Sequence, residues 1–169
     1  MIHLNLGSNL GERFNNITIA VNLLIEEKIK VIKISNFYET PSYPNQNLPK
    51  YLNVGILADY ANDHFNLFKK IKLIEKKMGR KRSKKNDPRI IDIDIVDFKK
   101  ITLKSKDLVL PHPKCHQRNF VLYPILQIDN NWSHPVLKKI NLIEKKIGRK
   151  KSKKNEARII DIDIIDFNG

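Results

Sequence analysis

The stretch RIIDIDIVDF, Arg89–Phe98, alternates apolar and acidic residues with a period of two. This is the period of a β-strand, in which successive side chains point to opposite faces. Asp92 and Asp94 therefore share one face, with their Cα atoms about 6.6 Å apart, and the isoleucines share the other. The stretch predicts a strand with one buried face and one face that carries a pair of carboxylates.

The segments around this strand have the periodicities of further strands and helices. Alternating and β-branched residues predict strands at 2–6, 29–39 and 51–60, and apolar residues at helical spacing predict helices at 14–25 and 65–78. The predicted inner face of the second helix consists of Phe65, Phe68, Ile71, Ile74 and Met78. The element order predicts an α+β fold, a ferredoxin-like antiparallel sheet with the helices packed on one face.

The ends of the second helix have their own signals. Asn62 or Asp63 is the predicted N-cap, because these short polar side chains can accept hydrogen bonds from the first free N–H groups of a helix. Gly79 is the predicted stop, because glycine readily adopts the left-handed conformation that ends many helices.

Length and composition indicate one compact domain, because 169 residues with 41% hydrophobic content can bury a core. The single cysteine, Cys115, cannot form an internal disulfide and has no CxxC partner for zinc, which suits a reducing compartment. The N-terminus lacks the pattern of a secretory leader, and no apolar run reaches the length of about 18 residues that a membrane span needs. We therefore expect a soluble cytoplasmic protein.

The formal charge of +14 and the pI near 9.8 indicate an anionic partner. The plainer interpretation is that much of this charge reflects a composition rich in Lys, Ile and Asn throughout. The clustered part, GRKRSKKNDPR at Gly79–Arg89, places six cations in eleven residues directly before the carboxylates. This order suits the phosphates of a nucleotide, with Mg²⁺ bridging them to Asp92 and Asp94. A GxxxxGK[ST] motif is missing from the sequence, so side chains would have to hold the phosphates.

These patterns also have plainer interpretations. A lone D-x-D strand is often the solvated face of an amphipathic strand, and isolated aromatic residues are often part of a core. The alternative function is a basic ferredoxin-like module that binds nucleic acid. Such a module would display aromatic residues on an open sheet face and would have no need of paired acids, which repel phosphate without a metal.

Four segments, in this order, carry a resemblance to a known family. They are LNLGSNLGERFNNI (4–17), SNFYETPSYPNQNLPKYLNVGI (35–56), GRKRSKKNDPRIIDIDIVDF (79–98) and LVLPHPKCHQRNFVLYPILQI (108–128). Together they resemble the 6-hydroxymethyl-7,8-dihydropterin pyrophosphokinases of folate biosynthesis. The resemblance implies a ferredoxin-like fold, ATP as co-substrate, two Mg²⁺ ions, and transfer of a pyrophosphoryl group to the hydroxymethyl oxygen of the pterin with release of AMP.

The resemblance also implies roles for individual residues. The implied metal ligands are Asp92 and Asp94, and the implied catalytic residues are Arg80, Arg82, Arg89 and Asp94. The implied ATP contacts are Glu75, Arg80, Arg89, His112 and Arg118. The implied pterin site consists of Thr40, Pro41, Tyr43, Tyr51, Asn53 and Phe120. In that site, Tyr51 and Phe120 would form a stacking slot for the flat pterin and Asn53 would hydrogen-bond to it. The implied partners are ATP and the pterin, without nucleic acid or membrane.

A second RIIDIDI, at Arg158–Ile164, belongs to a longer repeat. Residues 138–167 align with 69–98 without gaps and differ at six of thirty positions, so duplication explains the repeat better than convergence. We expect a pyrophosphokinase domain at 1–137 and a C-terminal segment at 138–169. The first half of that segment has the spacing of a closing helix, and its second half could add an edge strand, pair with another copy of the chain, or form a tail.

The double substitution Asp161→Asn plus Asp163→Asn should leave turnover within about twofold of wild type, because no equivalent of His112, Arg118 or Phe120 follows the second copy. A chain that ends after Ile147 should also stay active. Both are measured as AMP formed from ATP in the presence of the reduced hydroxymethyl pterin. If the double variant lost AMP formation while Asp92→Asn kept it, the site would lie in the second copy instead.

Overall fold

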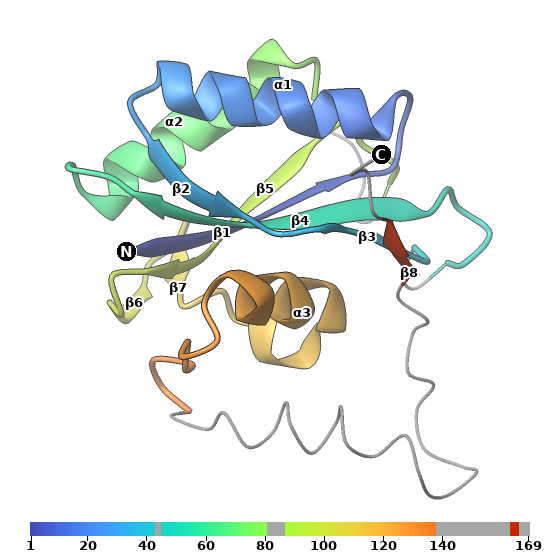
Figure 1. The fold of residues 1–169 in the computed structure, drawn as a ribbon. Coiled ribbons are helices and arrows are strands. Elements are labelled where there is room, and N and C mark those ends of the chain that lie inside the picture. The colour runs from blue at the N-terminus through green and yellow to red at the C-terminus, as the bar shows by residue number, and fades with distance from the viewer. Residues whose placement is uncertain (43–44, 81–86, 138–162, 166–169) are drawn as a thin grey trace, which may run out of the picture.

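The computed structural model describes residues 1–42, 45–80 and 87–137, and the backbone of 163–165 (Figure 1). A central sheet organises them. Its strands are β1 (Ile2–Ser8), β2 (Lys30–Ile34), β3 (Phe37–Thr40), β4 (Tyr51–Asp59), β5 (Asp92–Phe98) and β8 (Asp163–Ile165). The order is β5-β1-β4-β3-β8, with β2 also paired to β4, and each of these pairs is antiparallel. The predicted α+β, ferredoxin-like sheet is confirmed.

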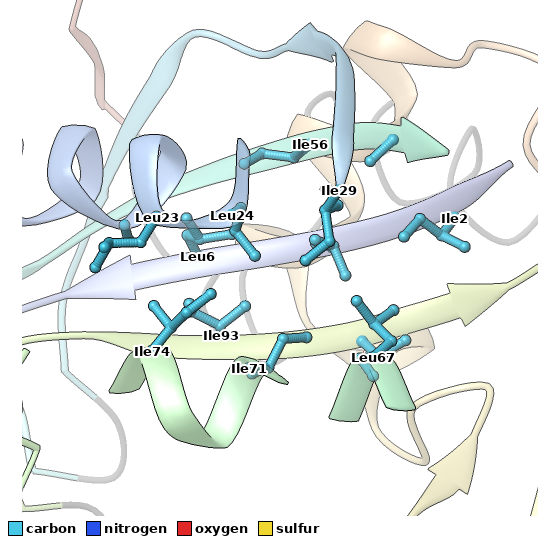
Figure 2. Close-up of a cluster of buried hydrophobic side chains, with 14 of the residues drawn as sticks. Ile2, Leu6, Leu23, Leu24, Ile29, Ile56, Leu67, Ile71, Ile74 and Ile93 are labelled. Carbon is cyan, nitrogen blue, oxygen red and sulfur yellow. The ribbon is translucent and has the colours of Figure 1, made fainter. Parts of the chain in front are cut away.

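Helices α1 (Arg13–Glu26) and α2 (His64–Lys77) cover one face of this sheet (Figure 1). Figure 2 shows the layer between them, in which Leu6 from β1 and Ile93 from β5 meet Leu24 from α1 and Ile71 from α2. Burying one such aliphatic side chain contributes about 1.5–3 kcal/mol. This layer is the main core, and it buries the isoleucine face of β5, as the alternating pattern predicted.

The ends of α2 follow the sequence signals. The Asp63 carboxylate accepts the N–H groups of Phe65 and Asn66 at 2.7 and 2.9 Å, so Asp63 is the cap. Gly79 has φ +84°, the conformation expected of a glycine stop. The predicted inner face is wrong at Phe65, which is 43% exposed, while Leu67 is fully buried. Phe65 lies in the first turn of the helix, where its ring packs on His64 with centroids 4.5 Å apart.

A third helix corrects the expectation that the helices share one face. Helix α3 (Asn119–Ile128) packs on the opposite face of the sheet, preceded by a short 3₁₀ turn at Cys115–Gln117 (Figure 1). Its buried residues Val121, Leu122 and Ile125 form a second, smaller core with Val96 and Trp132. Its sequence, NFVLYPILQI, is apolar nearly all round, so it lacks the polar face that marks a surface helix.

The predicted strand 29–39 is two strands in the structure. The break falls at Ser35, whose hydroxyl accepts the N–H of Gly55 at 2.9 Å and whose own N–H donates to the Gly55 carbonyl at 3.0 Å. The N–H of Asn36 donates to the side chain of Gln127 in α3 at 2.8 Å instead of to a neighbouring strand. Periodicity could not reveal this break, because the partners come from distant segments.

Two short strands and the chain beyond α3 complete the described fold. Strands β6 (Leu103–Lys104) and β7 (Val109–Leu110) form a separate hairpin. The backbone of β8 pairs with β3 of the same chain, and the predicted closing helix lies outside the described residues. Among the described helices, none combines the length and the apolar character needed to cross a membrane. Pairing of the C-terminal strand with another copy of the chain stays a prediction.

Gly55→Ala should lower the free energy of unfolding by about 1–3 kcal/mol, the usual cost of overpacking. A Cβ at position 55 would lie 2.8 Å from the Cβ and 2.9 Å from the carbonyl carbon of Pro124, and the α3 backbone cannot move aside as a side chain can. Gly7→Ala is the matched control, because its nearest neighbours are side-chain atoms of Asn53 and Tyr51, the closest at 3.1 Å. Denaturant unfolding compares the two; equal losses would show that close approach of α3 is not the constraint.

Candidate active site

The register of β1 brings the predicted metal and pterin residues onto one face. Gly7 lies opposite Asn53 on β4 and opposite Asp92 on β5, and Asn5 lies opposite Asp94. Directly opposite residues in an antiparallel sheet point to the same side, and neighbouring strands are about 4.8 Å apart. Asn53 and Asp92 therefore project from the same face with a glycine between them.

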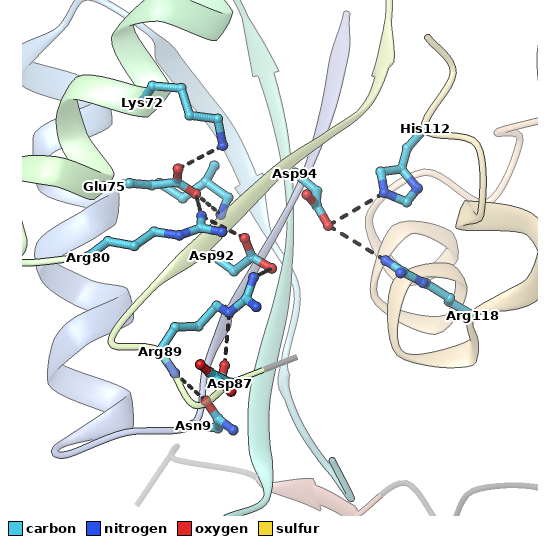
Figure 3. A network of polar contacts seen from close by, with 11 residues as sticks. Asn9, Lys72, Glu75, Arg80, Asp87, Arg89, Asp92, Asp94, His112 and Arg118 are labelled. Atoms are coloured by element: carbon cyan, nitrogen blue, oxygen red, sulfur yellow. Dashed lines mark hydrogen bonds and ion pairs between the residues drawn. The ribbon is translucent and has the colours of Figure 1, made fainter. Parts of the chain in front are cut away.

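Asp92 is held between two arginines that lie on either side of the basic segment. Its Oδ1 is 2.7 Å from Nη1 of Arg80, and its Oδ2 is 3.2 Å from Nη1 of Arg89 (Figure 3). Hydrogen bonds between charged partners of this kind are stronger than neutral ones. Arg80 and Arg89, both predicted to contact phosphate, thus lie against Asp92, a predicted metal ligand.

Glu75, from α2, supports this arrangement. Its side chain is 3% exposed, and its Oε1 accepts both the Arg80 guanidinium and the main-chain N–H of Ile93, the latter at 2.9 Å. Its Oε2 lies 2.8 Å from Nζ of Lys72 (Figure 3). Glu75 therefore fixes Arg80 and the backbone of β5 between the two aspartates. Its predicted contact with ATP stays a prediction.

Asp94 lies on the other side of the site, facing the segment before α3. Its Oδ2 is 3.8 Å from Nε2 of His112 and 3.8 Å from Nη1 of Arg118 (Figure 3). Burial and, next, the Asp92 carboxylate raise the pKa of Asp94 to about 7. A divalent cation would offset this repulsion, and carboxylate oxygens are ligands that Mg²⁺ prefers. The pair therefore fits a magnesium site.

His112 faces Asp94 with a neutral imidazole ring, beyond hydrogen-bond distance. Its main-chain N–H donates to the carbonyl of Val96 at 2.9 Å, which ties the Pro111–Pro113 turn to β5. Its Nδ1 accepts the N–H of Lys114 at 3.2 Å, so the proton of the neutral ring lies on Nε2. Burial and, next, Arg118 lower the pKa of His112 to about 4, and the ring is uncharged at neutral pH.

The predicted pterin residues come from β3, β4 and the first turn of α3. The Asn53 side chain is buried, and its amide nitrogen donates to Oγ1 of Thr40 at 2.9 Å. Tyr51 lies two residues earlier on the same face of β4, and burial raises the pKa of its phenol. Phe120 carries the Arg118 guanidinium 5.5 Å from its ring centroid. The close approach of β4 and α3 at Gly55 places these elements together.

The remaining sequence predictions divide into two groups. Pro41 directly follows β3, whereas Tyr43 and Arg82 lie outside the described residues.

Sequence reasoning assigned no role to Gly7, Asn9 or Lys72, which the structure brings to the site. The first two belong to LNLGSNLGERFNNI (4–17), one of the four segments that carry the resemblance. Lys72 could have been found from the sequence, because it lies three residues before Glu75 on the predicted helix and such pairs lie next to each other.

A group of sulfur and nitrogen ligands lies apart from the carboxylate pair. Among the described residues, Cys115, His116 and His134 offer ligand atoms within 4.8 Å of one another. However, Nδ1 of His134 accepts the N–H groups of Val136 and Leu137 at 3.3 and 3.2 Å, which places the ring proton on Nε2. Burial raises the pKa of the Cys115 thiol to about 11. Without a metal, the Cys115 thiol and Nε2 of His134 are thus protonated, and we assign no metal to this group.

Comparison with known proteins identifies the family. Residues 3–130 match the family model for 7,8-dihydro-6-hydroxymethylpterin-pyrophosphokinase (HPPK). The chain belongs to the HPPK family. It is 39% identical to the 2-amino-4-hydroxy-6-hydroxymethyldihydropteridine pyrophosphokinase of Aquifex aeolicus, a match that covers 82% of this chain and 86% of that protein. The protein of the same name from Bacillus subtilis is 32% identical, over 75% of this chain and 76% of that protein.

Other members of the HPPK family are parts of longer proteins. The folic acid synthesis protein fol1 of Pneumocystis carinii is 35% identical over 80% of this chain, which spans 18% of that protein. The crystal structure of Plasmodium falciparum HPPK-DHPS with pteroate matches with a TM-score of 0.68 and 20% identity, over 88% of this chain and 42% of that chain. At this identity the structural match supports the fold of the HPPK domain.

Glu75→Gln should lower the free energy of unfolding by about 1–3 kcal/mol, because an amide cannot accept from Arg80, Lys72 and Ile93 together. Glu26→Gln is the control: Glu26 is 66% exposed and lies 3.8 Å from Lys77 in a surface pair, whose loss should cost less than about 1 kcal/mol. Denaturant unfolding measures both variants. Similar small losses would mean that Glu75 does not organise the site.

Proposed function

We propose that this chain transfers a pyrophosphoryl group from ATP to 6-hydroxymethyl-7,8-dihydropterin and releases AMP, as a step in folate biosynthesis. The bond between the pterin hydroxymethyl oxygen and the β-phosphorus forms, the bond from the α,β-bridging oxygen to the β-phosphorus breaks, and the hydroxyl proton is lost. Membership of the HPPK family supports this reaction. The observation that carries it is the placement of the Asp92–Asp94 pair and Asn53 on one sheet face, separated by Gly7.

The carboxylate pair would hold magnesium. Asp92 and Asp94 project side by side from β5, and burial together with the neighbouring Asp92 carboxylate raises the pKa of Asp94, an unfavourable placement of charge that a cation would offset. We propose two Mg²⁺ ions at this pair, in line with the resemblance noted from the motifs. When bound, Mg²⁺ neutralises phosphate charge and orients the nucleotide.

The cationic side chains around the pair would bind the triphosphate. Arg80 and Arg89 come from the two ends of the basic segment, and Arg118 comes from the start of α3, so the three approach from different sides. Fixed positive groups of this kind stabilise the charge that develops as the phosphoryl group moves. The neutral His112 would donate its Nε2–H to a phosphate oxygen. Arg82 is proposed to join them.

The pterin would lie beside the metal pair, between the two aromatic residues. Tyr51 and Phe120 are proposed to stack on its two faces, and the amide of Asn53 is proposed to hydrogen-bond to its ring. Thr40, which accepts from the Asn53 amide nitrogen, fixes the orientation of that amide. Pro41 and Tyr43 are proposed to line the same side. The buried, free Cys115 supports a reducing, cytoplasmic location.

The alternative, a nucleic-acid-binding module, has less support. RNA-binding sheets of this architecture stack bases on an open face. Here helices cover both faces of the sheet (Figure 1). The carboxylate pair would also repel a phosphate backbone unless a metal were present.

Asp92→Asn and Asp94→Asn should each lower turnover by about a thousandfold or more, because stabilisation of charge by a metal is worth several kcal/mol. Both should fold. The assay is AMP formation from ATP with the reduced hydroxymethyl pterin at saturating Mg²⁺; ADP would be the product of an ordinary kinase. Asp107→Asn, at an exposed aspartate in the β6–β7 connection, is the matched control and should retain full activity.

Two outcomes would contradict the proposal. Wild-type protein that forms no AMP with this pterin would overturn the reaction itself. Variants of Asp92 or Asp94 that retain near wild-type AMP formation would overturn the metal assignment. Removal of Mg²⁺ with EDTA should abolish turnover in the wild type. Adding Mg²⁺ back in excess of EDTA should restore it.

A further inference from the structure

Asn9 lies in the turn that follows β1 and makes a continuous set of hydrogen bonds, although no role has been assigned to it. Its side chain is buried, with 1% of the residue exposed. Its Oδ1 accepts the main-chain N–H of Arg89 at 2.8 Å, and its own N–H donates to the Arg89 carbonyl at 3.2 Å (Figure 3). Asn9 therefore holds the backbone of Arg89 at two points.

The other end of the same amide contacts the segment between β3 and β4. Nδ2 of Asn9 donates to the carbonyl of Pro49 at 3.2 Å and to Oγ of Ser42 at 3.3 Å. The Ser42 hydroxyl in turn donates to the same Pro49 carbonyl at 2.5 Å. Ser42 is buried and lies two residues after Thr40, the partner of Asn53. One side chain thus joins the two ends of the β3–β4 segment to Arg89.

We infer that Asn9 is a positioning residue that fixes the pterin side of the site relative to Arg89 on the phosphate side. The inference rests on the proposed function, because that function identifies one side as the pterin side and the other as the phosphate side. The geometry itself is independent of it: Asn9 links two segments that are 40 residues or more apart from each other in the chain and that share no strand pairing.

The chemistry of the amide explains why asparagine is needed. The position of Asn9 requires one acceptor, for the Arg89 N–H, and one donor group, for the Pro49 carbonyl and Ser42. Both must lie at the end of the same short side chain. Aspartate retains the acceptor but places a second oxygen 3.2 Å from the Pro49 carbonyl oxygen. Alanine removes both contacts and leaves buried groups without partners, which is costly. The two substitutions therefore separate the two halves of the link.

The experiment compares Asn9→Asp, Asn9→Ala and Ser42→Ala with wild type. For Asn9→Asp we expect the KM for the pterin to rise about tenfold, the equivalent of one lost hydrogen bond, and the KM for ATP to stay within about twofold. Asn9→Ala should also lower kcat, because Arg89 loses an anchor. Ser42→Ala introduces no charge and should raise the KM for the pterin alone.

Asn16→Asp is the matched control. Asn16 is the other asparagine that braces this turn, with its Nδ2 bonded to the Leu10 carbonyl at 2.8 Å and to Oγ of Ser8 at 3.2 Å. It touches neither Arg89 nor the β3–β4 segment in the described contacts. It should lose stability as Asn9→Asp does and leave both KM values unchanged.

Hydrogen exchange without substrates gives a readout that does not depend on the reaction. Asn9→Asp should speed exchange in peptides from Thr40–Lys50 and leave peptides from Arg89–Phe98 unchanged, whereas Asn9→Ala should speed both. If Asn9→Asp matched Asn16→Asp in both exchange and KM values, the inference would be overturned. If wild type formed no AMP but the exchange pattern held, the proposed function would fail and the link between the segments would stand.

Discussion

The register of β1 between β4 and β5 is the constraint on which the rest of the structure depends. Side chains alternate along a strand, so a slip of one residue would move every side chain to the other face. In the observed register, the leucines of β1 and the isoleucines of β5 enter the main core, and Asn5, Gly7, Asp92 and Asp94 remain on the other face. The hydrophobic core therefore holds the acidic pair in place, although the two lie on opposite sides of the sheet.

The charges near the acidic pair form a series of ion pairs. Glu75 pairs with Arg80, Arg80 pairs with Asp92, and Arg89 pairs with the other oxygen of the same carboxylate. Each buried charge has a partner of opposite sign, which offsets the large cost of removing ions from water. Asp94 has partners at longer range and a raised pKa. The described contacts thus neutralise Asp92 more fully than Asp94, and a cation would complete the balance.

Helix α3 packs on the face of the sheet that carries the aspartates (Figure 1). It approaches β4 closely because Gly55 has no Cβ to meet Pro124, and it carries Arg118 and Phe120 at its start. The chain before it is tied to β5 by the bond from His112 to Val96. The chain after it is tied back by the Trp132 indole, which donates to the buried Asp97 at 2.9 Å. Both ends of the helix are therefore anchored to the strand that carries the aspartates.

The sequence by itself determined the β5 pattern, the caps of α2, the fold class and the grouping of basic residues before the acidic pair, because these depend on local periodicity and on residue chemistry within a few positions. The motifs also pointed to the HPPK family. Tertiary structure alone decided that α3 covers the second face, that strand 29–39 breaks at Ser35, and that Gly7 separates Asn53 from Asp92. The roles of Asn9 and Glu75 also emerged there, since their partners lie in distant segments, and such contacts leave no periodic trace in the sequence.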